Sequence, residues 1–375
     1  MNENNKIFED LFVLEMTNNH LGSVERGLEI IKNFSRIVRF NNVRAAIKFQ
    51  FRDVENFIHK DFVANKDIRY VKRTIETKLS FDQYKVLVKA VRDGGCIPMA
   101  TPFDESSVDW CCEFDMPIIK VASADSNDWI LLEKIARTKR PVIVSVAGMS
   151  VKDNDDLVTF FKNRNIPLAI NHCIAAYPTQ TGEMELNQID YLKNRYPNNV
   201  IGLSLHDSNE KNDYILSMHI GYAKGARTFE RHIDIDTDGT KISPYSFRPE
   251  QIDAWFKAYK YVKEACGSPG TERKLPMPKE TDFLDNYIRG VYARRNLPKG
   301  HKLTNESYID DVYLAIPLQK GQISCRELMS GEALTKDIKK DEPIMIDNID
   351  SPYASNEELK KTIYNRGLDN GKKKS

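Results

Sequence analysis

The sequence predicts a parallel (β/α)8 barrel followed by a much smaller C-terminal domain. Two observations predict the barrel: eight short apolar runs alternate with amphipathic stretches of helical period, and all eight fall within about 260 residues, the usual size of this fold. A third observation, a segment rich in proline, glycine and charge at 267–285, predicts a linker before the second domain.

Each predicted strand is a run of apolar and β-branched residues, and the connections are long enough for one helix each. The segment 50–97 is longer, so we expect an additional loop or hairpin there. The eight predicted strands cover residues 11–17, 45–50, 97–103, 117–123, 141–147, 168–174, 200–206 and 226–233.

The connecting segments carry helical signals of two kinds. Ser23 and Asp128 stand directly before amphipathic stretches and are predicted N-caps. The first of these stretches places four apolar side chains near one helix face, which predicts packing against the barrel. These are Val24, Leu28, Ile31 and Phe34.

The C-terminal part divides into two segments after the barrel (1–266) and the linker. Residues 286–350 contain short β-like runs in a unit of about 65 residues, too small for much core of its own, so we expect it to pack on something else. Residues 351–375 end in GKKKS and are predicted to form a frayed polar tail.

Composition limits the class of function. Apolar residues make up 41% and charged residues 29% of the 375 residues, which is typical of a packed globular protein. Lysine and arginine total 55 against 54 acidic residues, so the net charge of +1 argues against binding to nucleic acid through a broad basic surface. Small ligands are the expected partners.

Cysteine spacing and hydropathy predict the compartment. The six cysteines form no C-x-x-C pair, so reduced thiols are expected. The chain shows neither a signal-peptide pattern nor an apolar span of about 18 residues. We therefore expect a cytoplasmic protein without a membrane segment.

Polar residues end almost every predicted strand, and a barrel carries its functional groups at these C-terminal ends. One such residue alone is most often structural, but the coincidence over all eight strands predicts an active site. The residues are Glu15, Lys48, Gln50, Asp104, Lys120, Ser123, Ser145, His172, Ser204, His206, Glu230 and His232.

Lys48 and Lys120 lie within apolar runs, where an unpaired charge is costly. A phosphorylated ligand held by both lysines and by strand-end serines would remove that cost. Internal ion pairs, for instance with Glu15 or Asp125, would do so equally well. The residues alone leave both readings open.

Two histidines end neighbouring strands. His206 and His232 could share one divalent cation, with water and substrate completing its coordination. Two ligands are a weak signal, and a hydrogen-bonded core or catalytic histidine is the alternative. Cys173 is expected to be packed rather than nucleophilic.

Seven short motifs stand in a recognisable order. They are E-x-x-x-N-H-x-G, IKFQ, TPFD, IKVAS, HC-x-x-x-YPT, GLS-x-H and E-x-H. In this order the chain resembles the sialic acid synthase family over residues 8–266, and residues 286–347 are similar to that family's C-terminal antifreeze-like (SAF) domain.

The resemblance implies a phosphoenolpyruvate-dependent nonulosonate synthase. Such an enzyme condenses phosphoenolpyruvate with the open-chain aldehyde of an acylated amino sugar and releases phosphate, using a divalent metal, Mn²⁺ or Mg²⁺. It also implies a domain-swapped homodimer in which the small domain of one subunit caps the active site of the other.

The resemblance assigns roles residue by residue. Glu15 matches the acidic residue near the reacting carbon, and His206 and His232 match the metal ligands. The phosphoenolpyruvate-binding positions are Lys48, Lys120, Ser123, Ser145 and Ser204, and the positions near the acceptor sugar are Gln50, Asp125, Tyr177 and Glu230.

The chain departs from the family pattern mainly on the acceptor side. Asp125 stands where glutamate is common, VSVAG replaces the usual STG around Ser145, and LSLHD and DIDTDGTKISPYSF replace two further family phrases. The small domain has YLAIPLQKGQIS where an RPG-type motif supplies an arginine, unless Arg289 or Arg326 supplies it. These departures predict an acceptor other than N-acetylmannosamine.

Two alternatives remain. One is a synthase that uses a phosphorylated or non-acylated aldose. The other is a catalytically silent binding protein of the same fold, which the retained buried charges disfavour.

Overall fold

The structure is a computed structural model that describes residues 3–65, 67–237, 239–267, 273–328, 331–351 and 354–369. The chain divides into two compact units, Met1–Gly267 and Ser268–Ser375. Each is described by itself below.

The first unit is a closed barrel of eight parallel strands, which confirms the predicted fold class. The strands are hydrogen-bonded in sequence order, and β1 pairs with β8 to close the cylinder. Their bounds lie within the predicted runs except at Phe51. The strands are β1 Leu11–Glu15, β2 Ala45–Phe51, β3 Ile97–Pro102, β4 Ile119–Val121, β5 Val142–Ser145, β6 Leu168–Cys173, β7 Val200–Ser204 and β8 Thr228–Ile233.

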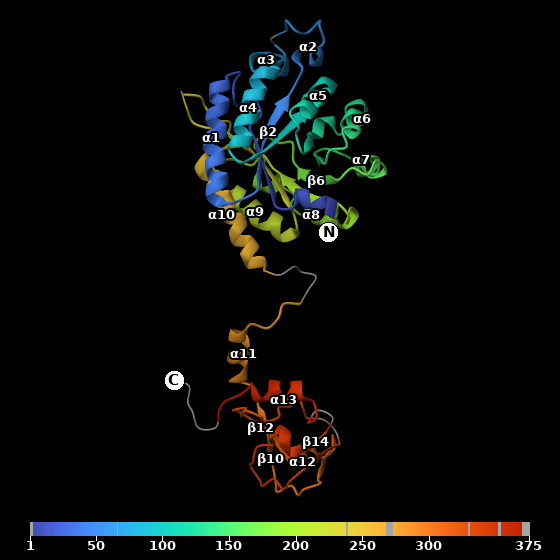
Figure 1. Ribbon diagram of the computed structural model, residues 1–375, viewed down its shortest axis with the longest axis vertical. Helices are drawn as coiled ribbons and strands as arrows, with labels where there is room; N and C mark the ends of the chain where they lie inside the picture. The colour runs from blue at the N-terminus through green and yellow to red at the C-terminus, as the bar shows by residue number, and fades with distance from the viewer. Residues whose placement is uncertain are drawn as a thin grey trace. The chain divides into compact units, whose positions relative to one another are not determined.

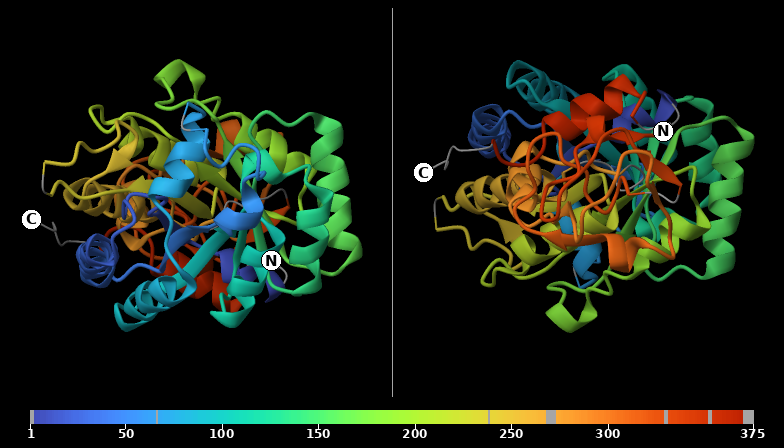
Figure 2. Two further views of the ribbon diagram at one scale, coloured as in Figure 1. Left: turned by 90° about the horizontal axis from the view of Figure 1, so that it is seen from above. Right: turned by 90° about the horizontal axis from the view of Figure 1, so that it is seen from below.

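Helices surround the strands (Figures 1 and 2). Ser23 and Asp128 cap α1 and α6 as predicted, accepting hydrogen bonds from the amides of Arg26 and Leu131. Every described helix is too short or too polar to span a bilayer. The surrounding helices are α1 Val24–Asn41, α4 Phe81–Asp93, α5 Glu105–Glu113, α6 Trp129–Arg137, α7 Val151–Asn163, α8 Gln188–Arg195, α9 Asp213–Lys224 and α10 Pro249–Cys266.

The long connection between β2 and β3 differs from the prediction. Its described part carries two extra helices, α2 Val54–Phe57 and α3 Arg69–Glu76, rather than a hairpin. Figure 1 shows both beyond the tip of the β2 arrow, at the end where the strands finish. Shorter elements of this unit are η1 Glu3–Phe8, η2 Ser123–Asp125, η3 Thr181–Glu183 and β9 Ser246–Phe247.

The core lies in two layers. Between strands and helices, the Phe12 ring meets the rings of Trp255 and Phe256 edge to face, at centroid distances of 5.0 and 4.8 Å. Inside the barrel, Phe8 of η1 packs with Val13 and other inward-facing residues near the start of the strands. This packed floor leaves the functional groups to the opposite end.

The second unit has small antiparallel sheets and a core of its own. One sheet pairs β10 with β12, and another orders β11, β13 and β14. Ile323, Ile344 and Ile346 are wholly buried in this core, so the expectation that the unit has little core was wrong. The strands are β10 Gly290–Ala293, β11 Lys302–Leu303, β12 Val312–Ala315, β13 Glu332–Leu334 and β14 Ile349–Asp350, with α12 Tyr308–Asp311 and η4 Ile346–Asn348.

Two predicted irregular segments contain helices. The linker ends in α11 Pro278–Asp285, and the polar tail contains α13 Glu357–Tyr364. The described part of the tail is not frayed, because Ile363 is wholly buried in the core of this unit and Arg366 forms an ion pair with Glu327 at 2.6 Å. Both helices were missed because α11 buries no residue and α13 buries only Ile363, so neither carries an apolar period that the sequence could show.

Candidate active site

A cavity of about 610 Å³ lies at the C-terminal ends of the barrel strands. Every residue to which the resemblance assigned a site role lines it, although these residues come from seven different strands or strand ends. They are Glu15, Lys48, Gln50, Lys120, Ser123, Asp125, Ser145, Tyr177, Ser204, His206, Glu230 and His232.

Lys48 lies between two carboxylates. Its ammonium forms an ion pair with Glu15, a second with Glu230 at 3.3 Å, and donates a hydrogen bond to the hydroxyl of Thr101 at 3.0 Å. β2 carries Lys48 beside Glu15 because these two residues are in register in the β1–β2 pair. Of the two readings for Lys48, the structure therefore contains the internal ion pair.

Lys120 has a different environment. Its ammonium donates hydrogen bonds to the Ser145 hydroxyl at 2.7 Å and to the Val121 carbonyl at 2.9 Å, and the nearest Glu230 oxygen is 4.0 Å away. The Ser123 hydroxyl accepts a hydrogen bond from the amide of Ala147 at 3.1 Å. This side of the cavity presents one ammonium and several hydroxyls, the donors that suit a phosphate or carboxylate.

The four buried charges titrate differently. Burial raises the pKa of Glu15 in spite of Lys48 beside it. Burial also opposes ionisation of Glu230, but Lys48 and Lys120 outweigh it and lower its pKa. Burial lowers the pKa of Lys120, whereas the two carboxylates outweigh burial at Lys48 and raise its pKa. Two neighbouring carboxylates with opposite shifts are typical of an acid/base site.

The two histidines lie together at the ends of β7 and β8. Their ring centroids are 5.0 Å apart. The Nδ1 of His206 lies 2.9 Å from the Ile174 carbonyl oxygen, which places the proton of this ring on Nδ1 and leaves Nε2 free. The buried Nδ1 of His232 has no partner among the described residues. Burial lowers the pKa of both, so both rings are neutral and suited to metal ligation.

Residues assigned to the acceptor lie around the mouth of the cavity. The amide of Gln50 donates to Glu15 at 3.1 Å, and the Tyr177 ring packs on His206 at 4.1 Å between centroids. Burial raises the pKa of Asp125 to about 6, and the negative charge of Asp128 adds to this shift. The Oδ2 atom of Asp125 is buried and has no partner among the described residues. An unpaired buried oxygen is what a ligand hydroxyl could satisfy.

Two strand-end residues in the first list, Asp104 and His172, do not line the cavity. Asp104 caps α5, accepting from the amide of Ser107 at 2.8 Å, and also accepts from the amide of Asp53. The His172 ring contacts the Met184 carbonyl outside the barrel. Cys173 lines the cavity, but burial raises the pKa of its thiol, as expected of a packed cysteine.

Some lining residues had no assigned role. Arg52, two positions after Gln50 on the same strand face, donates to the Gln50 side-chain oxygen at 3.0 Å, and strand alternation could have indicated it. Arg69, Arg73 and Tyr245 also line the cavity. They come from loops and an extra helix, where no periodic pattern relates them to the strands.

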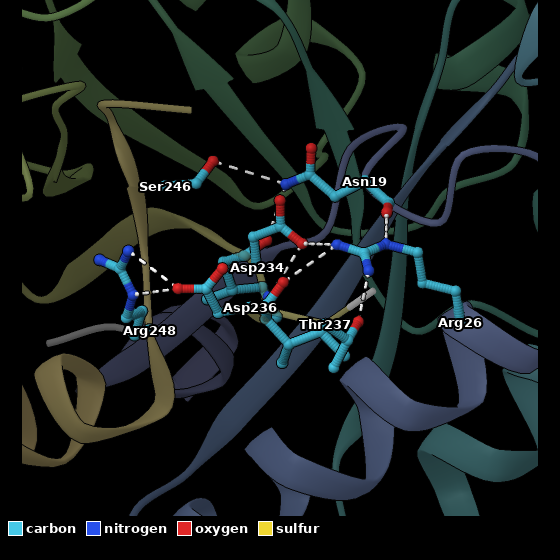
Figure 3. A network of polar contacts seen from close by, with 9 residues as sticks. Asn19, Arg26, Asp234, Asp236, Thr237, Ser246 and Arg248 are labelled. Atoms are coloured by element: carbon cyan, nitrogen blue, oxygen red, sulfur yellow. Dashed lines mark hydrogen bonds and ion pairs between the residues drawn. The ribbon is translucent and has the colours of Figure 1, made fainter. Parts of the chain in front are cut away.

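The asparagine of the E-x-x-x-N-H motif has a positioning role. The Asn19 amide donates to the Ile233 carbonyl at 2.8 Å, directly after His232. Arg26 binds the Asn19 carbonyl at 2.7 Å, Asp234 at 2.8 Å and Thr237 at 2.6 Å (Figure 3). These contacts fix the loop after β8 to the loop after β1.

Comparisons with known proteins agree with this geometry. The model of a family described as the NeuB family matches residues 42–271, more than half of the chain. A crystal structure of a protein from Chromobacterium violaceum assigned to spore coat polysaccharide biosynthesis is 34% identical, covers 92% of this chain and all of its own, and superposes with a TM-score of 0.86.

Two curated relatives have named activities. N-acetylneuraminate-9-phosphate synthase of Mus musculus is 25% identical over 90% of this chain and 92% of its own. Pseudaminic acid synthase of Campylobacter jejuni is 26% identical over 82% of this chain and 87% of its own.

Proposed function

Because the chain belongs to the NeuB family, whose synthases condense phosphoenolpyruvate, we propose that it joins phosphoenolpyruvate to the aldehyde carbon of an aldose, forming a nonulosonic or related ulosonic acid and releasing phosphate. One observation carries the proposal: all the residues implied by the resemblance line a single cavity at the strand ends. Holding both substrates there supplies much of the rate enhancement.

Phosphoenolpyruvate is assigned to the side of the cavity formed by β4, β5 and β7. The cavity is lined there by one ammonium and three hydroxyl groups, those of Lys120, Ser123, Ser145 and Ser204, and Lys48 lies at the border of this side. The family resemblance and the donor chemistry support this assignment.

Glu15 is assigned the proton transfers. Its raised pKa allows it to hold a proton, while Glu230 stays ionised between the two lysines. In the reaction, the enolic carbon of phosphoenolpyruvate attacks the aldehyde carbon, and the aldehyde oxygen takes the proton of Glu15. Water then adds to the resulting cationic carbon, and the ionised Glu15 takes a proton from that water. Cleavage of the C–O bond to phosphate turns this carbon into the ketone, and the remaining hydroxyl proton leaves with the phosphate.

His206 and His232 are the residues that would hold the divalent cation, Mn²⁺ or Mg²⁺. Two neutral imidazoles, one with an unpartnered buried nitrogen, fit that role. Among the described residues no cluster of three His, Cys, Asp or Glu side chains is arranged around a metal, so other ligands must come from water or substrate. The chemistry such a cation supplies is polarisation of a carbonyl oxygen.

The acceptor is proposed to differ from N-acetylmannosamine. Lys320, in the segment that replaces the RPG-type motif, is held by Asp369 at 2.8 Å, which limits its use as a substitute for the missing arginine. Lysine also matches planar acyl groups less well than arginine. Arg289 and Arg326 are exposed in the same unit and are the alternative sources of that contact.

Assembly and compartment are part of the proposal. A domain-swapped homodimer in which the small unit caps the partner's cavity is supported by the resemblance and by a segment of about 18 residues between the units. A cytoplasmic location is supported by membership of the NeuB family.

The test uses the full-length protein with Mn²⁺, phosphoenolpyruvate and a panel of hexosamines, N-acyl hexosamines, pentoses and aldose phosphates. We expect phosphate release and a product with the mass of one aldose plus the elements of pyruvic acid. No phosphate release with any aldose would contradict the proposal and favour a silent binding protein.

A further inference from the structure

Three arginines form one wall of the cavity mouth. Arg52 follows β2, and Arg69 and Arg73 lie one turn apart on α3; we call these three residues the arginine wall. Arg69 is exposed and the neighbouring Tyr70 is 75% exposed, which places α3 at the entrance, whereas His206 is only 5% exposed. The wall therefore faces the outer part of a bound ligand.

The positive charge of the wall is not neutralised by the protein. Five cationic side chains line the cavity against three carboxylates, and Glu15 and Glu230 already lie beside Lys48 and Lys120. Within the described residues, no carboxylate forms an ion pair with any arginine of the wall. The remaining carboxylate, Asp125, cannot balance three guanidinium groups.

Arg52 is held in place by an aromatic ring and a hydrogen bond. Arg52 stacks on the Phe103 ring at 3.7 Å and donates to Gln50. Burial lowers the pKa of Arg52, and the positive charge of Arg73 lowers it further, so the two guanidinium groups repel one another. Holding like charges together without a counter-ion costs free energy. An anion that binds between them removes this cost.

The start of α3 adds to this potential. The residue before the helix, Ile68, gives no side-chain cap, and the first turn holds no acidic residue. The positive end of the helix is therefore uncompensated where Arg69 stands. Because arginine binds phosphate and carboxylate in a bidentate manner, the combination suits one localised anionic group.

The neighbours of the wall are acceptor-side residues. Arg52 contacts Gln50 and acts electrostatically on Asp125, and Tyr70 of α3 acts on Tyr177. Arg73 acts electrostatically on His232, one of the two proposed metal ligands. The wall therefore neighbours residues assigned to the acceptor and to the cation.

We propose that the acceptor is an aldose with an anionic group, phosphate or carboxylate, on its terminal carbon, and that Arg69 and Arg73 bind this group while Arg52 supports it. This inference rests on the proposed synthase function. With the aldehyde held deep in the barrel near His206 and His232, the far end of an extended aldose reaches the entrance, where the wall lies.

The first experiment compares three acceptors that differ at one carbon: N-acetylmannosamine, its 6-phosphate and its 6-carboxylate. With full-length protein, saturating phosphoenolpyruvate and Mn²⁺, we expect kcat/KM of a charged acceptor to exceed that of the neutral sugar by at least about tenfold, as expected for hydrogen bonds to a charged group. Whichever charged acceptor is preferred identifies the anion. Equal or better turnover of the neutral sugar overturns the proposal.

The second experiment removes the wall. In the double variant Arg69→Gln, Arg73→Gln, we expect kcat/KM for the charged acceptor to fall by at least about tenfold and by more than kcat/KM for the neutral sugar. Lys72→Gln, an exposed charge on the same helix that does not line the cavity, is the matched control. A rise in KM for phosphoenolpyruvate without acceptor discrimination overturns the proposal, because the wall would then serve that substrate.

A binding experiment separates this inference from the synthase function. The alditol of the 6-phosphate lacks an aldehyde and cannot react, so its affinity is measured by calorimetry in the presence of phosphoenolpyruvate. Tighter binding than the neutral alditol, lost in the double variant, supports the wall even if no aldose is turned over. Equal affinity of the two alditols, or binding unaffected in the double variant, overturns it even if the enzyme is an active synthase.

Discussion

The imidazole rings of His206 and His232 lie edge to face, 5.0 Å between centroids and 66° between planes, at the ends of two adjacent strands. Because burial of part or all of each ring lowers the pKa of both, two uncharged nitrogen donors face the space in which the aldehyde is expected. This pair is the basis of the first prediction.

Substituting either histidine should weaken metal binding. We expect His206→Ala and His232→Ala each to lower Mn²⁺ affinity by at least about tenfold, since each removes one of two proposed protein ligands. The affinity is measured by calorimetric titration of protein freed of metal by chelation. His219→Ala, on α9 outside the cavity, is the control. Wild-type affinity in both variants, or full activity after exhaustive chelation, would contradict the metal site.

Lys120 should contribute directly to phosphoenolpyruvate binding. Lys120→Met is expected to lower the affinity about ten- to a hundredfold, the scale of about 1.5–3 kcal/mol for a hydrogen bond to a charged group. Calorimetry or fluorescence measures it. Lys32→Met, on the exposed face of α1, should change nothing.

Lys48→Met is expected to lower the affinity for phosphoenolpyruvate about as much as Lys120→Met does, but this substitution also destabilises the fold. Removing Lys48 leaves Glu15 and Glu230 without their shared partner, so we expect an additional loss of about 3–5 kcal/mol in the free energy of unfolding. Unchanged phosphoenolpyruvate affinity in both lysine variants would mean that the lysines serve internal ion pairs alone.

His20 should make the barrel less stable in acid. It is wholly buried, accepts a hydrogen bond from the Gly22 amide at 3.1 Å, and burial lowers its pKa to about 4. Between pH about 6.5 and 4 the unfolded chain binds a proton that the folded chain excludes, so the free energy of unfolding falls as the pH falls, by up to about 3 kcal/mol.

The variant His20→Asn tests this dependence, because asparagine keeps an acceptor and does not titrate. We expect its loss of stability between pH 7 and 4.5 to be smaller than that of the wild type. Urea unfolding followed by tryptophan fluorescence measures it, since Trp110, Trp129 and Trp255 all lie in the barrel. Parallel pH profiles would show that His20 is not responsible.

Arg366 should stabilise the small unit. Its guanidinium pairs with Glu327 at 2.6 Å, and Glu327 also accepts from the amide and hydroxyl of Ser324. Arg366→Met leaves a buried carboxylate unpaired, which costs about 3–5 kcal/mol. Hydrogen exchange of residues 291–349 should show faster exchange, whereas the exposed Arg326→Met should not. Unchanged hydrogen-exchange protection in Arg366→Met would indicate that the C-terminal tail contributes little to the stability of the small unit.

Local patterns were sufficient for the barrel and for most of the site. Apolar runs of β-branched residues predicted all eight strands, and parallel strands place their polar ends at one side, so residues such as Ser145 and Ser204 could be grouped without a structure. Local pattern failed for α3 and α13, since tertiary contacts at Thr74 and Ile363 stabilise short polar helices.

By itself, the sequence determined the barrel, the order of its strands, the family and those cavity residues that stand at strand ends. Each of these is visible in apolar periodicity or in short collinear motifs. Only the tertiary structure decided which charges neutralise one another. Closure of β1 on β8 brings Glu15 and Glu230, far apart in the chain, to the same lysine, and it leaves the arginine wall without a counter-charge. Electrostatic pairing depends on distances across the closed barrel, and those distances exist only once the chain has folded.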